Sequence, residues 1–185
     1  MSVKQELVSQ HQIEIKPLNT QDVEKFDPIL RQHVRDRNTG EILENEITQI
    51  KGHMKGEPDE YGRTRKYFVA KTIDGQVLGC MGYTIMDMDP DMVKHFSDLN
   101  PENTTELVNA FVDSEVFRGG GVGRKLFESV CTAAKAEGKT HLTVNSGPRY
   151  KDSWGFYDHM FDENKGMIIG KYGPDGNAKI WLKKL

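Results

Sequence analysis

A glycine-rich stretch, residues 116–125 (VFRGGGVGRK), contains residue types that can bind an anion. Glycines let a bound group approach the backbone closely, and the first amides of a helix carry unpaired N–H donors and a partial positive charge. Residues 106–112, just before it, are apolar enough for a buried strand. After it, apolar residues recur at helical spacing: Val122, Leu126, Phe127, Val130, Cys131 and Ala134. A glycine-rich turn between a strand and a helix predicts a phosphate cradle. A turn that only permits tight packing is the alternative.

The spacing of the glycines excludes two common phosphate loops. A Walker A loop requires G-x-x-x-x-G-K-[ST], and the stretch lacks both this spacing and the hydroxyl residue. A dinucleotide fingerprint requires a further glycine where the sequence has Arg124 or Leu126. The pattern that fits is R-x-x-G-x-G, formed by Arg118, Gly121 and Gly123.

This pattern resembles the acyl-CoA loop of the GCN5-related N-acetyltransferase (GNAT) superfamily, whose amides hold the CoA pyrophosphate. The resemblance implies acetyl-CoA as the co-substrate, held by the end of the preceding strand, the loop and the first helical turn. The residues predicted to bind it are Phe111, Val112, Asp113, Arg118, Gly119, Gly120, Gly121, Val122, Gly123 and Arg124.

The order of the expected elements is β-α-α-β-β-β-α-β-α-β-β. Strands are expected at 13–18, 67–70, 77–85, 106–112, 141–145, 166–170 and 178–182, with a hairpin turn at Asp74-Gly75. Helices are expected at 20–35, 42–54, 122–137 and 153–160, with a short one at 92–99. This order resembles the GNAT fold. It implies an α/β (mixed α+β) domain with a mostly antiparallel sheet of six to seven strands, splayed between the fourth and fifth, and about four flanking helices.

A second motif follows the fifth strand. GNAT proteins often carry N-x-x-A-x-x-[LF]-Y there, with a tyrosine that can protonate the departing thiolate. Phe156 and Tyr157 match its end, Ser153 stands at the small-residue place, and Tyr150 replaces the asparagine. The resemblance implies that Tyr157 is the catalytic acid. An aromatic ring that only packs on the helix is the alternative.

The general base is harder to assign. In relatives it often projects from the fourth strand, on the face that regular alternation gives here to Thr105, Leu107 and Asn109. None of these is a carboxylate or a histidine, and Glu106 would point to the opposite face. We infer that deprotonation runs through water held by Asn109, or through an acid from elsewhere.

Length and composition bound the remaining possibilities. The 185 residues predict a single GNAT domain over residues 1–185, with residues 1–11 flexible. Net charge is −3 and basic residues are scattered, which gives no support for binding nucleic acid or an anionic membrane. No apolar run approaches the ~20 residues of a membrane span, and the N-terminus lacks a signal-peptide core, so a cytoplasmic location is expected.

A metal site is not expected. Cys80 and Cys131 lie in apolar patterns, and the histidines show no metal-ligand spacing. The acidic run that begins at Asp87 has an EF-hand-like spacing, but Pro90 interrupts it and Met92 occupies the glycine place. The sequence therefore predicts a solvated acidic loop here.

Two functions remain. The first is an N-acetyltransferase that transfers an acetyl group from acetyl-CoA to a primary amine of a small molecule or peptide. The second is a non-catalytic acyl-CoA-binding or regulatory module that keeps the cradle and has lost the base. A nucleotide-binding protein is disfavoured by the loop spacing, and homodimerisation is left open.

Overall fold

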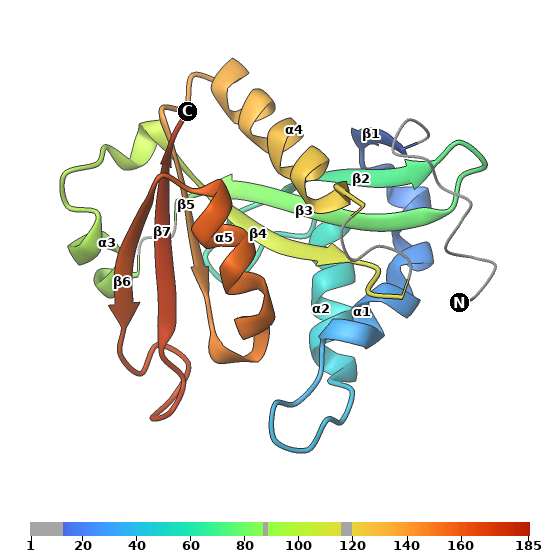
Figure 1. Cartoon of the computed structure of the whole chain (residues 1–185), viewed down its shortest axis with the longest axis horizontal. Coiled ribbons are helices and arrows are strands. Elements are labelled where there is room, and N and C mark those ends of the chain that lie inside the picture. Colours follow the sequence, from blue (N-terminus) through green and yellow to red (C-terminus); the bar gives the residue numbers. More distant parts are fainter. Residues whose placement is uncertain (1–12, 87–88, 116–119) are drawn as a thin grey trace. The chain divides into compact units, whose positions relative to one another are not determined.

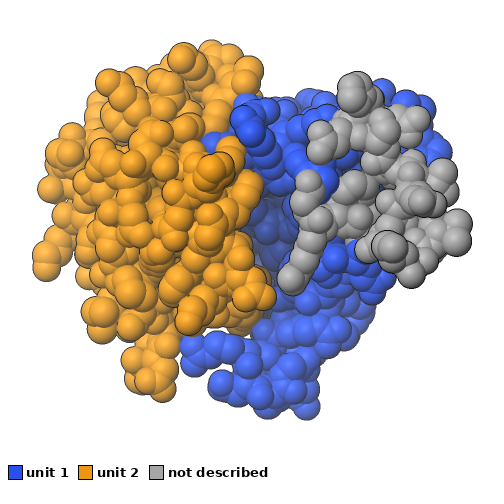
Figure 2. Space-filling view, in the orientation of Figure 1, with its two compact units in different colours: residues 1–83, 109–130 blue, residues 84–108, 131–185 orange. Residues whose placement is uncertain are grey.

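A computed structural model of the chain describes residues 13–86, 89–115 and 120–185 (Figure 1). Predictions for residues 1–11, Asp87, Arg118 and Gly119 lie outside the described residues. The chain divides into two compact units, residues 1–83 with 109–130 and residues 84–108 with 131–185, coloured separately in Figure 2. Each unit is described by itself.

Seven strands form one sheet in the order β1-β2-β3-β4-β5-β7-β6. Their bounds are β1 Ile13–Pro17, β2 Lys66–Thr72, β3 Val77–Ile85, β4 Thr104–Val112, β5 His141–Ser146, β6 Glu163–Ile168 and β7 Ala178–Lys184. Strands β4 and β5 are parallel, whereas the pairs β1–β2, β2–β3, β5–β7 and β6–β7 are antiparallel. The predicted mixed, mostly antiparallel sheet is confirmed.

Along the chain, the helices follow and precede these strands in the predicted order. The α-helices are α1 Asp27–His33, α2 Glu44–Met54, α3 Pro90–His95, α4 Val122–Ala136 and α5 Trp154–Met160. Short 3-10 segments are η3 Thr20–Phe26, η4 Pro101–Asn103 and η5 Pro148–Ser153.

The predicted hairpin between β2 and β3 is confirmed, with Gly75 in the left-handed conformation at φ +90° and its amide bonded to the Thr72 carbonyl. A glycine within β3, Gly79, sets how close β4 can come. A Cβ at Gly79 would lie 2.6 Å from the carbonyl oxygen of Phe111, so only glycine allows this approach. The sequence of β3 thus permits the close pairing that positions the end of β4.

The prediction of one continuous helix over 20–35 is wrong, because the structure divides this segment into two helical pieces. The structure has the 3-10 segment η3 up to Phe26 and the α-helix α1 from Asp27 onward. Pro28 explains the break, because proline lacks the N–H that would continue the helical ladder and disfavours helical geometry in the residue before it. Proline is well placed in the first turn of the new helix, where it stands here.

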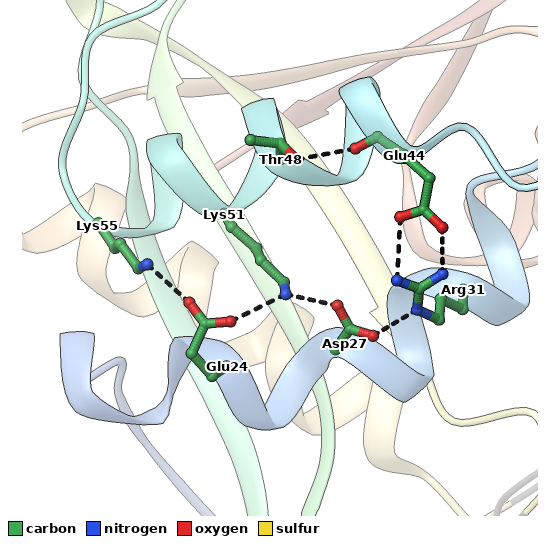
Figure 3. A network of polar contacts seen from close by, with 7 residues as sticks. All are labelled: Glu24, Asp27, Arg31, Glu44, Thr48, Lys51 and Lys55. Atoms are coloured by element: carbon green, nitrogen blue, oxygen red, sulfur yellow. Dashed lines mark hydrogen bonds and ion pairs between the residues drawn. The ribbon is translucent and has the colours of Figure 1, made fainter.

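An ion-pair network joins α2 to η3 and α1 within the first unit (Figure 3). The Lys51 ammonium lies 3.0 Å from Glu24 and 2.5 Å from Asp27. The Arg31 guanidinium binds both carboxylate oxygens of Glu44, at 2.5 and 3.0 Å. These contacts hold α2 against η3 and α1.

The buried Asp22 carboxylate accepts hydrogen bonds from Lys25, at 2.7 Å, and from Lys71 of β2. The hydrogen bonds from Lys25 and then Lys71 hold the pKa of Asp22 below its ordinary value of 3.8. We expect Asp22→Asn to lower the free energy of unfolding at pH 7 by ~1–3 kcal/mol. Because the pKa is depressed in the folded state, the wild-type advantage should be lost as the pH falls below 3.8.

Chemical denaturation of both proteins between pH 7 and pH 3 measures this difference. The exposed Asp98 provides a matched control, since Asp98→Asn removes one carboxylate outside that contact. An Asp22→Asn protein as stable as the wild type at pH 7 would contradict the prediction.

The second unit has its own apolar core. Side chains from α3, β6 and β7 meet there, including Met92, Phe96, Ile168 and Ile180. The predicted short helix at 92–99 is found two residues earlier, at Pro90–His95, because Asp89 caps it through the amide of Asp91 and proline opens its first turn. Strand β6, Glu163–Ile168, begins three residues earlier and ends two residues earlier than the predicted strand 166–170.

Candidate active site

Strand β4 is irregular at Asn109, which has φ +49° and is the non-glycine position with positive φ among the described residues. Left-handed backbone costs a non-glycine residue about 1–3 kcal/mol and persists where surrounding contacts impose it. Two such contacts are present. The Asn109 Oδ1 atom accepts hydrogen bonds from Arg65 Nη1 at 2.5 Å and from the Tyr67 hydroxyl at 2.8 Å.

Tyr67 reaches Asn109 from β2, across the intervening strand β3. A Cβ at Gly82 would lie 2.6 Å from the Tyr67 ring, so glycine leaves the space through which this ring passes. Burial raises the pKa of the Tyr67 hydroxyl, which therefore stays protonated and donates. With two donors on its oxygen, the Asn109 amide can offer only Nδ2 donors to another group.

The prediction from strand alternation assumed a regular β4 with Thr105, Leu107 and Asn109 on one face. The left-handed conformation of Asn109 interrupts this alternation. The structure keeps Asn109 in a polar cluster, but its oxygen is occupied. A water at Asn109 would therefore accept from Nδ2, so the amide can orient water but cannot take its proton.

Helix α1 holds the end of β4. The His33 ring donates from Nε2 to the Val112 carbonyl at 2.7 Å, and the ring centroids of His33 and Phe111 lie 5.7 Å apart. Gln32 donates to the Asp113 carboxylate at 3.2 Å and accepts from the Ser114 amide at 3.0 Å. The side chain of Asp113 thus serves the turn after β4, and the Asp113 amide donates to the Leu78 carbonyl at 2.9 Å. The predicted role of Val112 and Asp113 in binding acetyl-CoA therefore stays a prediction.

The described part of the predicted cradle is Gly120 to Arg124. Gly121 has φ +74°, and a Cβ built on it would meet nothing within 4 Å. The first bond of the α4 ladder runs from the Lys125 amide to the Gly121 carbonyl at 3.0 Å. The amides of Val122, Gly123 and Arg124 come before that bond, and by α-helix geometry they have no acceptor within the helix.

This geometry fits an anionic group. The open space at Gly121 and the first amides of a 15-residue helix, with its partial positive charge, suit a phosphate. The Arg124 side chain is exposed and pairs with Glu128 at 2.9 Å, one turn later. An incoming anion would therefore compete with Glu128 for this guanidinium.

In the second unit, Tyr157 is buried in α5. Its ring lies against Trp181 and Phe161, with centroid distances of 5.1 and 5.9 Å. Burial raises the pKa of the Tyr157 hydroxyl to about 12, while its hydrogen bond with Ser153 acts in the opposite direction. The hydroxyl is therefore protonated at every physiological pH.

Another buried acid lies on β4. Glu106 accepts a hydrogen bond from the Asn145 Nδ2 atom of β5 at 2.6 Å, and Asn145 in turn accepts from the Tyr172 hydroxyl. The three pairs of the parallel β4–β5 ladder run from Thr104 to Glu106. Glu106 thus stands at the last pair of that ladder, held by the neighbouring strand.

A model of the acetyltransferase (GNAT) family matches residues 32–161 of the chain. This range includes β4, the glycine-rich turn, α4 and α5. The chain belongs to the GNAT family.

Several solved GNAT structures share the fold. A GNAT-family protein from Desulfovibrio desulfuricans is 15% identical, with 93% of this chain and 98% of that chain covered and a TM-score of 0.68. The GCN5-related N-acetyltransferase from Kribbella flavida is 16% identical, covering 96% and 100%, with a TM-score of 0.66. A Salmonella typhimurium protein, described as an acetyltransferase with its cofactor acetyl-CoA, is 14% identical, covering 94% and 94%, with a TM-score of 0.63.

No curated protein matches the sequence significantly. Within the described parts of this GNAT chain, no helix is long and apolar enough to cross a membrane. Over the same residues, no three histidine, cysteine or acidic side chains gather as metal ligands would.

Sequence reasoning missed the residues that surround Asn109 and the end of β4. Arg65 and Tyr67 contact Asn109, and Gln32 and His33 contact the turn after β4. For Arg65 and Tyr67 the sequence contains one signal: they are two residues apart at the start of a strand, so their side chains share a face. For the second pair there was none, because Gln32 and His33 are 81 and 79 residues from their partners.

Proposed function

We propose that this GNAT protein is an N-acetyltransferase that transfers an acetyl group from acetyl-CoA to a primary amine by direct attack. The observation that carries the proposal is the left-handed Gly121 followed at once by the first turn of α4, in a chain whose family is established. The Salmonella relative described with acetyl-CoA supports the choice of acyl donor.

Acetyl-CoA, when bound, supplies an electrophilic thioester carbonyl and a thiolate leaving group. The chain must bind the anionic end of the donor, orient the amine and donate hydrogen bonds where negative charge develops. The amides of residues 120–124 bind and orient the pyrophosphate. Main-chain amides of β4 donate to the carbonyl oxygen.

Proton movements involve two further residues. The Tyr157 hydroxyl holds a proton that it can donate to the leaving sulfur, and burial keeps that proton in place. The Asn109 Nδ2 atom orients a water that takes the proton from the attacking amine. As the nitrogen–carbon bond forms and the carbon–sulfur bond breaks, one proton leaves the nitrogen and one reaches the sulfur.

The second candidate is a non-catalytic acyl-CoA-binding module. It is favoured by the missing carboxylate or histidine among Thr105, Leu107 and Asn109, and by the occupied oxygen of Asn109. The match of Phe156 and Tyr157 to the end of the second GNAT motif favours the enzyme. Turnover separates these functions, because a binding module has affinity for CoA without releasing thiol.

We expect acetyl-CoA to raise the melting temperature of the protein. A ligand present at 100 times its dissociation constant stabilises the folded state by ~2.7 kcal/mol, which corresponds to roughly 5–10 °C for a chain of this length. Thermal unfolding with and without acetyl-CoA measures this shift, with adenosine as a control that lacks phosphate. No shift at millimolar acetyl-CoA would contradict the proposed donor.

Timed thiol release with a panel of primary amines tests the transfer itself. We expect amine-dependent release of CoA and an acetylated product detectable by mass spectrometry. A protein that binds acetyl-CoA but releases no thiol with any amine would be assigned to the binding-module class.

A further inference from the structure

Arg65 is a largely buried cation with an incomplete set of partners. Its side chain is 15% exposed, and its Nη1 atom donates to Asn109 at 2.5 Å. Its Nη2 atom lies 3.8 Å from the Asp59 carboxylate, beyond hydrogen-bond length. The Nε atom is buried and has no hydrogen-bond partner among the described residues. A buried donor left in this state needs a physical explanation.

Asp59 does not supply the missing partner, because its carboxylate is already engaged. It accepts from the amides of Tyr61 and Arg63, at 3.0 and 2.9 Å, and from the Arg63 Nε atom at 2.8 Å. Burial would raise the pKa of Asp59, but the hydrogen bonds from Arg63 outweigh it and hold the pKa below its usual range. Asp59 is thus a fixed anion bound to Arg63, and it compensates the charge of Arg65 only at a distance.

The free side of Arg65 has the geometry of a carboxylate site. Nη1 is used by Asn109, so the Nε–Nη2 edge of the guanidinium carries no hydrogen bond. Two parallel N–H groups on one edge match the two oxygens of a carboxylate. The neighbouring Asn109 amide offers Nδ2, also a donor, since its oxygen accepts from both Arg65 and Tyr67. This corner therefore presents hydrogen-bond donors, and its nearest anion, the Asp59 carboxylate, lies 3.8 Å from Nη2 and is engaged by Arg63.

We infer that Arg65 and the Asn109 amide bind a carboxylate of the acceptor, so that the acceptor is an amine bearing a carboxylate near its nucleophilic nitrogen, as an amino acid does. The inference rests on the proposed function, which places the attacking amine beside Asn109. Binding requires the atoms that cover Nε to move aside, and it provides the acceptor that this buried donor lacks.

Paired acceptors test the inference. Each amino acid is compared with the amine that remains after removal of its carboxylate, such as leucine with 3-methylbutylamine and phenylalanine with phenethylamine. We expect kcat/KM to favour the carboxylated member about 10–100-fold, the size of charge-assisted hydrogen bonds. Arg65→Gln should reduce this ratio by a similar factor, through a higher KM for the amino acid. Arg65→Lys keeps the charge but not the paired donors, so it should keep more of the preference for the carboxylated member than Arg65→Gln does.

Lys66→Gln is the matched control, since it removes a neighbouring, exposed positive charge and should leave the ratio unchanged. Thermal unfolding verifies that each variant is folded. If Arg65→Gln is not folded, Arg65→Lys alone decides the test.

Equal rates for both members of each pair in the wild type would overturn the inference and leave the proposed function standing. A loss of acetyl-CoA affinity in the Arg65 variants would also overturn it, because the anion would then belong to the acyl donor. Absence of turnover with every amine contradicts the proposed function, and the inference falls with it.

Discussion

Replacing Gly123 by aspartate is expected to abolish acetyl-CoA binding while leaving the protein folded. Gly123 is the second residue of α4, where an acidic side chain interacts favourably with the helix dipole and where aspartate has a higher helix propensity than glycine. The same carboxylate would stand in the space of the phosphate and repel its charge. At about 4 Å and an effective dielectric constant of 20, that repulsion is ~4 kcal/mol, or roughly a 10³-fold weaker affinity.

Calorimetric titration with acetyl-CoA, together with thermal unfolding, measures both parts of this prediction. Gly123→Asn is the matched control, because it adds a side chain of the same shape without the charge, and its loss of affinity should be much smaller. Normal acetyl-CoA affinity in a folded Gly123→Asp protein would mean that the anion site lies elsewhere.

Gly121→Asp should also abolish acetyl-CoA binding, but it is less informative. The left-handed backbone at Gly121 costs a non-glycine residue roughly 1–2 kcal/mol, so this variant should also melt at a lower temperature. Gly121→Ala measures that conformational cost alone. Comparing the two substitutions at this position separates the effect of charge from that of strain.

Tyr157→Phe is expected to lower turnover about 10²-fold with little change in acetyl-CoA affinity. Positioned acids contribute ~10²–10⁴-fold, and a thiolate leaves fairly well unaided, so the lower end applies. The high pKa of Tyr157, about 12, points the same way. Complete transfer to a thiolate whose conjugate acid has a pKa near ~8.5 is uphill by ~5 kcal/mol, so the hydroxyl acts chiefly by hydrogen bonding to the developing charge.

The pH dependence gives a second test of Tyr157. Because its hydroxyl loses its proton only near pH 12, any decline in kcat between pH 8 and pH 10 should be the same in the wild type and in Tyr157→Phe. Tyr150→Phe is the control for loss of a nearby phenol and should retain turnover. Unchanged turnover in Tyr157→Phe would leave this ring a packing role against Trp181, and a collapse of acetyl-CoA affinity would make it a binding residue.

Local features of the sequence determined the fold class and the candidate cradle. The hairpin at Asp74-Gly75, the order of strands and helices, and the left-handed Gly121 just before α4 are found where residue types and spacing indicate them. These features depend on preferences of a few consecutive residues, such as positive φ at glycine or apolar periodicity, so they can be read without knowing the fold. The break at Pro28 belongs to the same class and could have been anticipated.

Only the tertiary structure decided the environment of Asn109. Arg65 and Tyr67 are 44 and 42 residues away in the sequence, and they meet Asn109 because β2 and β4 lie on either side of β3. Their contacts surround a non-glycine residue at φ +49° and occupy its oxygen, so only the Nδ2 atom remains to hold the water that was expected at Asn109. No local pattern encodes this, because the backbone strain and the burial of Arg65 are set by side chains that come together only when the sheet is assembled.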